Sequence, residues 1–145
     1  MEAWQEKRNL AESVTYAFDH SLWTDVELVC TNENGETLQI KAHKMMLASR
    51  SPVFEAMLFG PAADKGNTIQ ITTFSYEQMD LLIRFLYSEA IEISDDNAGN
   101  VLKTAHFFQV PSLVEKCCQL LQNRDLAEND VEDDDDNEEE DDNGD

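Results

Sequence analysis

Basic side chains are scarce in this sequence of 145 residues, which has ten Lys and Arg residues against 31 Asp and Glu residues. A nucleic-acid-binding protein needs a basic face to neutralise phosphates, so we expect no nucleic-acid partner. Long apolar runs are also missing, and none approaches the roughly 20 residues that a membrane-spanning helix requires. We therefore expect no membrane partner. The first residues show no charged segment followed by an apolar one, so nothing in them indicates secretion.

Cysteine is equally scarce, since the sequence contains only Cys30, Cys117 and Cys118. Three cysteines cannot all pair, and two of them are adjacent, which favours reduced thiols and a cytoplasmic or nuclear location. The sequence has no C-x-x-C or H-x-x-x-H pair, no calcium-binding loop and no glycine-rich phosphate loop. We therefore expect no metal and no cofactor.

Catalytic chemistry has little support in the sequence. A cysteine-dependent hydrolase, in which Cys30 or Cys118 meets a histidine in the fold, is the enzymatic alternative. However, Cys30 ends an alternating apolar pattern and Cys117 lies on an apolar helical stripe. Free cysteines in such positions act as small hydrophobic residues. We expect a protein that is not an enzyme.

The negative charge is concentrated at the end of the chain. The first 124 residues contain all ten basic side chains and 17 acidic ones, whereas residues 125–145 contain 14 acidic side chains and no basic one. Such a segment cannot bury enough apolar surface to offset the entropy lost on ordering. We predict a folded domain over 1–124 and a disordered acidic tail over 125–145, which either binds basic partners or keeps the protein soluble.

An amphipathic helix is predicted near the beginning of the chain, over 3–19. Leu10, Val14, Ala17 and Phe18 follow the spacing i, i+4, i+7 and i+8, which places them on one helical face. This apolar stripe needs a partner, either in its own domain or in another copy of the chain.

Three short strands are predicted after this helix. Residues 25–30 and 37–41 alternate between polar and apolar positions, and Asn34-Gly35 between them suits a tight turn with positive φ. Residues 68–72 show a third alternating pattern, and 91–93 is compatible with a short edge strand. The first two segments should form a β-hairpin.

The stretch "KAHKMMLASRSPVFEAML" surrounds His43 with three of the five methionines and raises the question of an active site. Ser51-Pro52 divides it into two short helices, because Ser is a favoured N-cap and Pro suits the first helical position. Its methionines fall at helical spacing beside other apolar residues, where Met fills irregular core gaps. We interpret the stretch as core, with His43 as a hydrogen-bonded structural residue.

Three further helices are predicted in the second half of the domain. Ser75 and Gln78 form a capping-box pattern ahead of a wide apolar arc over 75–89, which indicates a largely buried helix. A second helix is predicted from the capping region Asp95 to Asn97, and a third from a capping box of Ser112 and Glu115. The order of elements predicts an α+β domain that is rich in helix, with a small sheet on one side.

The segments "WTDVELVC", "LQIKAHKMMLASRSPVFEAMLFG" and "FLYSEAIEIS" resemble a BTB (POZ) domain. That family shows a strand beginning Asp-Val, an A-H-[KR]-x-x-L-A-x-x-S-x-x-F segment and a later F-x-Y-[ST]. The resemblance covers roughly residues 3–123. It implies a helix-rich BTB/POZ fold, in which a small three-stranded sheet is capped by helical hairpins and an N-terminal helix mediates dimerisation. The opening residues are similar to the BTB domains of BTB-BACK-PHR proteins, so the chain is either a stand-alone or a truncated member.

The resemblance implies a homodimer, and other BTB proteins are further candidate partners. In the family the N-terminal helix packs on the partner subunit, and an acidic and a basic residue line a charged pocket at the interface. The alternatives are a helix that packs only on its own domain and an ordinary exposed ion pair, worth about 0–1 kcal/mol. The positions that match the dimer interface are Trp4, Leu10, Val14, Phe18, Asp25 and Lys44.

The resemblance also implies a surface for cullin-3, the scaffold of a ubiquitin ligase. Many cullin-3 adaptors carry a hydrophobic-x-Glu motif after the S-x-x-F helix, where this chain has Ala62-Ala63-Asp64. The smaller side chain should forfeit about 1–2 kcal/mol, which is on the order of tenfold in affinity. Phe59, Tyr87 and Phe108 are further candidates for this surface, although each is also suited to the core.

The resemblance leads us to expect an interaction module that homodimerises and acts as an adaptor for a cullin-3 ubiquitin ligase. A dimerisation or dominant-negative subunit that does not bind the ligase is the alternative within the same class.

Overall fold

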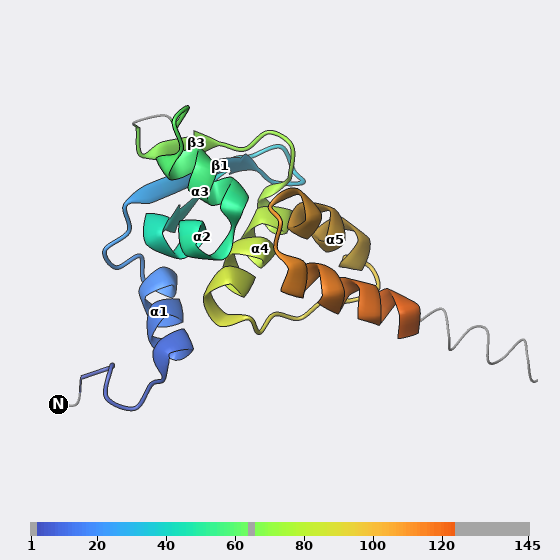
Figure 1. The fold of residues 1–145 in the computed structure, drawn as a ribbon, viewed down its shortest axis with the longest axis horizontal. Coiled ribbons are helices and arrows are strands. Elements are labelled where there is room, and N and C mark those ends of the chain that lie inside the picture. The colour runs from blue at the N-terminus through green and yellow to red at the C-terminus, as the bar shows by residue number, and fades with distance from the viewer. Residues whose placement is uncertain (1–2, 64–65, 124–145) are drawn as a thin grey trace, which may run out of the picture.

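The computed structural model describes residues 3–63 and 66–123, and the segment predicted to be an acidic tail lies outside them (Figure 1). A helix of residues 111–123 follows the labelled elements. None of the described helices is long and apolar enough to cross a membrane. In chain order the labelled elements are α1 (Leu10–Asp19), β1 (Val26–Thr31), β2 (Thr37–Ala42), α2 (Lys44–Arg50), α3 (Pro52–Phe59), β3 (Thr68–Gln70), α4 (Tyr76–Ser88) and α5 (Ala98–Phe107).

The small sheet has the strand order β2-β1-β3, with β1 antiparallel to β2 and parallel to β3. The predicted hairpin is confirmed, but its turn is longer than a two-residue turn, because the last pair in register is Thr31 with Thr37. The side chain of Asn32 accepts hydrogen bonds from the backbone of Asn34 and Glu36, and Gly35 has a φ of 86°. The edge strand suggested at 91–93 does not form.

The N-terminal helix is shorter than the predicted range 3–19, since α1 begins at Leu10. Asn9 is its N-cap, and the backbone N–H of Glu12 donates to the Asn9 side chain at 2.8 Å. The Glu12 carboxylate accepts the N–H of Asn9 at 2.8 Å, which completes a capping box. This pair fixes the start of the helix, because it satisfies two backbone donors that would otherwise lack partners.

The two short helices on either side of Ser51-Pro52 are confirmed as α2 and α3. The Ser51 hydroxyl accepts the N–H of Phe54 at 3.2 Å and donates to the carbonyl of Phe108 at 2.6 Å. This buried side chain therefore caps α3 and joins it to the segment that follows α5. Gly60 follows the last residue of α3. A Cβ atom added at this position would lie 2.5 Å from the carbonyl oxygen of Ala56, so a larger residue would clash with the helix backbone.

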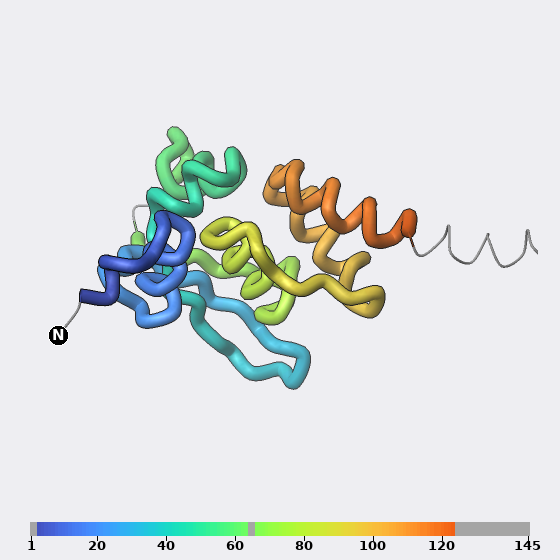
Figure 2. Tube along the Cα trace, turned by 90° about the horizontal axis from the view of Figure 1, so that it is seen from below, coloured from blue at the N-terminus to red at the C-terminus, as the bar shows by residue number. Residues whose placement is uncertain are grey.

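Helix α4 passes through the middle of the molecule, with the β1–β2 hairpin on one side and α2 and α3 on the other (Figure 2). Its predicted capping box, Ser75 with Gln78, is present. The capping box predicted at Ser112 and Glu115 is wrong, because the last helix begins at Pro111 and Ser112 therefore lies inside it. The wide apolar arc predicted for α4 is confirmed, since its buried residues are Met79, Leu82, Ile83, Phe85, Leu86 and Tyr87.

Candidate interaction surfaces

A hydrogen-bond network surrounds His43, which lies at the corner between β2 and α2. Its Nε2 is 2.6 Å from the carbonyl oxygen of Leu22, and its Nδ1 is 2.6 Å from the hydroxyl of Tyr87. Since a carbonyl can only accept, Nε2 carries the proton and Nδ1 accepts the proton of the Tyr87 hydroxyl. That hydroxyl accepts the backbone N–H of His43 at 2.9 Å. Both ring nitrogens are engaged within the domain, which confirms the structural role predicted for His43.

The thiols of Cys30 and Cys117 are fully buried and are poor nucleophiles. Burial raises the pKa of the Cys30 thiol to about 11. Burial also raises the pKa of Cys117, and the neighbouring Cys118 adds to this effect. A reactive cysteine needs the opposite change, a pKa below its ordinary value. The buried thiol of Cys30 therefore gives the hydrolase alternative no support. Within residues 3–63 and 66–123, no cluster of three metal-binding side chains occurs.

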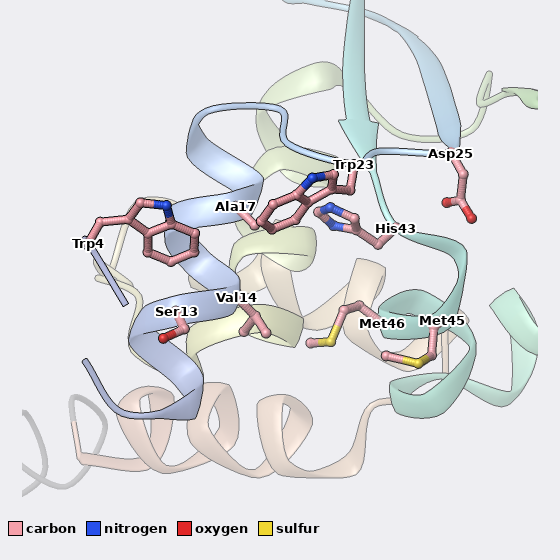
Figure 3. Close-up of a pocket in the computed structure, with 9 residues that line it drawn as sticks. All are labelled: Trp4, Ser13, Val14, Ala17, Trp23, Asp25, His43, Met45 and Met46. Carbon is pink, nitrogen blue, oxygen red and sulfur yellow. The ribbon is translucent and has the colours of Figure 1, made fainter. Parts of the chain in front are cut away.

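Two hollows open beside α1 and α2, and Figure 3 shows the residues that line the first of them. The first has a volume of about 360 Å³ and the second about 310 Å³, and most of their lining is apolar. Val14, Met45 and Met46 line both hollows, so the two form one surface. Trp4 and Trp23 complete the first hollow, and Leu10 lies at the second.

Three large apolar side chains project from this surface into solvent. Leu10 is 80% exposed, Met45 is 73% exposed and Trp23 is 71% exposed. We call the set of Leu10, Val14, Trp23, Met45 and Met46 the α1–α2 face. Exposed apolar surface of this kind marks interaction sites in soluble proteins.

The His43 network holds the loop that presents Trp23. The carbonyl of Leu22, which accepts from His43, immediately precedes Trp23. Trp23 has a φ of 59°, a left-handed conformation that costs energy for a residue with a bulky side chain. The backbone from which the exposed indole projects is therefore held in place. Sequence reasoning placed neither Trp23 nor Met45 in an interface, because neither falls on the helical stripe of α1.

Helix α1 is bound firmly to α4 of its own chain. The Phe18 ring packs on the Tyr87 ring with their centroids 4.6 Å apart, and the Arg84 guanidinium lies 5.2 Å from the centroid of Phe18. Arg84 also forms ion pairs with Asp19 at 2.8 Å and with Asp80 at 3.2 Å. The assignment of Phe18 to a dimer interface is corrected, because its side chain is buried in the core of its own domain.

The other apolar positions predicted for the dimer interface are partly exposed and partly packed against their own chain. Trp4 stacks on Tyr16 of α1 with a centroid distance of 4.3 Å, so it folds back on its own helix while still lining the first hollow. Val14 is half-buried and lines both hollows, whereas Leu10 is free to meet a partner. Of the predicted apolar positions, Leu10 and Val14 thus remain on the α1–α2 face.

The charged pair predicted at Asp25 and Lys44 takes a different form. The Asp25 carboxylate accepts the backbone N–H of Lys44 at 2.7 Å, whereas the Lys44 ammonium donates to Asn67 at 3.1 Å. Asp25 thus caps α2 from outside the helix, where a negative charge near the N-terminus is stabilising. The alternative of an ordinary ion pair between Asp25 and Lys44 does not form in the described structure, whereas the charged pocket at a dimer interface stays a prediction, and Asp25 lines the first hollow.

The residues predicted to bind cullin-3 are also divided between surface and core. Phe59 is 61% exposed at the end of α3, and Ala62 in the following turn is exposed. Tyr87 is 3% exposed and Phe108 is 1% exposed, so their assignment to a binding surface is corrected to the core. Asp64 lies outside the described residues.

Phe107, which sequence reasoning did not select, is the exposed member of its pair with Phe108. Its side chain is 51% exposed at the end of α5 and contacts Phe74 edge-on, with their centroids 5.3 Å apart. Phe108 stacks instead on Phe54 of α3, with a centroid distance of 4.5 Å. The sequence carries a signal for this difference, because Phe108 continues the i, i+4, i+7 apolar spacing of α5 and Phe107 does not.

Comparisons with known proteins agree with this architecture. The BTB domain of zebrafish PATZ1 superimposes with a TM-score of 0.67, covering 85% of this chain and 97% of that domain at 19% sequence identity. The BTB/POZ domain-containing protein 6-B of Danio rerio is 30% identical over 88% of this chain and 26% of its own length. Kelch-like protein 36 of Rattus norvegicus is 31% identical over 76% of this chain and 17% of its own length.

The chain spans less than half the length of the curated relatives that it matches. The sequence profile of the BTB/POZ domain matches residues 15–125, which is most of the chain. This chain belongs to the BTB/POZ domain family, whose domains are protein-interaction modules.

Proposed function

We propose that the chain forms a homodimer through the α1–α2 face. The observation that carries this proposal is the group of three large apolar side chains, each more than two-thirds exposed, beside two apolar hollows. A two-fold dimer brings the same surface of both subunits together, so projections of one subunit can enter hollows of the other. The family resemblance supports a second copy of the chain as the partner.

The composition of the α1–α2 face fits a protein interface. Tryptophan and methionine are enriched in interface cores, and polar residues form the rim. Asp25 lies at the edge of the first hollow, and Arg50 and Glu89, which pair with each other, lie at the second. A partner surface can therefore bury the apolar centre while these charged groups keep contact with water.

Multi-angle light scattering on the whole chain and its variants tests this proposal. We expect the mass of two chains at micromolar concentration, and the mass of one chain for Leu10→Asp combined with Met45→Asp. Leu38→Asp is the matched control, because Leu38 is an exposed leucine on the hairpin that lines neither hollow. A dimer in the double variant, or loss of the dimer in the control, places the interface elsewhere.

We further propose that the dimer serves as an adaptor for cullin-3, and a separate observation favours this role. Phe59 and Phe107 expose aromatic rings at the ends of α3 and α5, and neither lines the hollows of the α1–α2 face. Phe107 touches Phe108, which stacks on Phe54 of α3, so packed aromatic rings connect the two helices. Exposed aromatic side chains are frequent anchors of protein interfaces.

Titration calorimetry with purified cullin-3 separates the adaptor role from the alternative of a dimerisation subunit. We expect binding that weakens about tenfold or more in Phe59→Ala and in Phe107→Ala, which each remove an exposed aromatic anchor. His106→Ala is the control, since His106 is an exposed neighbour on the same helix. Absence of binding by the unmodified dimer would leave the dimerisation or dominant-negative role as the conclusion.

A further inference from the structure

Met45 differs from the other described methionines in its exposure. Met79 is completely buried and Met46 and Met57 are half-buried, whereas Met45 is 73% exposed. Oxidation of a methionine requires access of the oxidant to the thioether sulfur, so susceptibility follows exposure. Met45 is thus the described methionine whose thioether a dissolved oxidant reaches most readily.

The position of Met45 connects its oxidation to the α1–α2 face. Met45 is the second residue of α2, and its side chain extends toward α1 beside that of Met46 (Figure 3). It lines both hollows and projects from the α1–α2 face. An apolar thioether suits this surface, because methionine adapts its shape to a partner.

We propose that Met45 is an oxidation site at which peroxides control self-association. The sulfur lone pair attacks one peroxide oxygen, an S–O bond forms and the O–O bond breaks. The second oxygen leaves with its hydrogen and takes up the proton of the transferred hydroxyl to form water. The sulfur is oxidised by two electrons to the sulfoxide, and the peroxide is reduced. No residue of the protein needs to act as a catalyst in this step.

The sulfoxide opposes dimer formation, because it places a strong dipole on a surface that must be freed from water. The apolar members Leu10, Val14 and Met46 of the α1–α2 face offer the sulfoxide oxygen no hydrogen bond, because none of their side chains carries a donor. Burying a polar group without a hydrogen bond is unfavourable, and we expect the dimer dissociation constant to rise about tenfold or more. This inference rests on the proposed dimer.

The dimer in turn protects Met45. When two copies associate through the α1–α2 face, the thioether is covered, so only the dissociated chain is oxidised readily. Once oxidised, the chain dimerises more weakly until the sulfoxide is reduced, a reaction that methionine sulfoxide reductases perform. The oxidation rate of Met45 therefore falls as protein concentration rises, whereas the rates at methionines outside this face do not.

Hydrogen peroxide treatment of the full chain tests the inference. Fragment-ion mass spectrometry measures the oxidation rate of each methionine at two protein concentrations, one above and one below the dimer dissociation constant. Sedimentation velocity measures that dissociation constant before and after the peroxide treatment. Among the described methionines we expect Met45 to oxidise fastest and mainly at the low concentration, and the dissociation constant to rise about tenfold or more. In Met45→Leu, peroxide should leave the constant of that variant unchanged, while Met57→Leu should respond as the unmodified chain does.

The outcomes distinguish this inference from the proposed function. A chain that stays monomeric before treatment overturns both. A chain that dimerises, but whose dissociation constant is the same after complete oxidation of Met45, overturns the inference and leaves the dimer in place. Equal oxidation rates for Met45 at the two concentrations also overturn it.

Discussion

Replacement of Tyr87 by phenylalanine tests the polar network at the centre of the domain. The change keeps the ring that packs on Phe18 and removes only the hydroxyl. That hydroxyl accepts the backbone N–H of His43 at 2.9 Å and donates to its Nδ1 at 2.6 Å. Tyr87→Phe therefore leaves two polar groups of His43 without partners inside the domain.

The expected loss of stability follows from those two groups. An unsatisfied buried donor or acceptor costs about 1–3 kcal/mol, and water can reach part of the half-buried His43. We expect the free energy of unfolding to fall by about 2–4 kcal/mol. Tyr76→Phe is the control, because the Tyr76 hydroxyl has no hydrogen-bond partner among the residues that the structure describes, and its effect should stay within about 0.5 kcal/mol.

Urea denaturation followed by circular dichroism measures both variants. A double-mutant cycle that combines Tyr87→Phe with His43→Ala gives the coupling energy between the two side chains. This energy should reach about 1 kcal/mol or more, because the stability effects of substitutions at directly bonded residues are not additive. A Tyr87→Phe variant as stable as the unmodified chain, or a cycle with no coupling, refutes the network as a source of stability.

Four further outcomes are expected. Ser51→Ala should destabilise the domain by about 2 kcal/mol, because it removes the cap of α3 and the buried bond to Phe108, and thermal unfolding measures this loss. Iodoacetamide at pH 8 should modify the half-buried Cys118 before the buried Cys30, whose pKa is raised to about 11. Because the folded-state pKa of Cys30 is raised above its ordinary value of 9.0, its contribution to stability is complete below pH 9 and decreases as pH rises toward 11, which unfolding titrations across that range measure. Gln109→Gly should stabilise the domain by about 0.5–1 kcal/mol, because Gln109 directly follows the C-cap of α5 and has a φ of 56°. Urea denaturation that shows destabilisation would contradict this explanation.

The parts of the fold that sequence could predict depend on short-range signals. Ser51-Pro52 and Ser75 with Gln78 mark helix starts within four residues, so these boundaries agree with the structure. The same signal at Asn9 and Glu12 marks the true start of α1, but the prediction extended the helix back to residue 3, although its apolar stripe begins only at Leu10.

Long-range contacts were beyond sequence reasoning. Asp25 caps α2 from a point 19 residues earlier in the chain, and only the fold brings its carboxylate to the N–H of Lys44. The choice between Phe107 and Phe108 depends on where α5 ends, because the next residues turn through the left-handed conformation of Gln109. Phe108 nonetheless continues the apolar spacing of α5 and Phe107 does not, so this difference, unlike the cap by Asp25, could be predicted from the sequence.

The central claim, that the α1–α2 face joins two copies of this chain, is tested most directly by sedimentation velocity over a dilution series of the whole chain. We predict a reversible change from dimer to monomer, and the double variant Leu10→Asp with Met45→Asp should shift its midpoint about 100-fold or more to higher concentration. Each substitution removes an apolar side chain worth about 1.5–3 kcal/mol on burial and introduces a charge. A single monomeric species at every concentration, or an unchanged midpoint in the double variant, would contradict the claim.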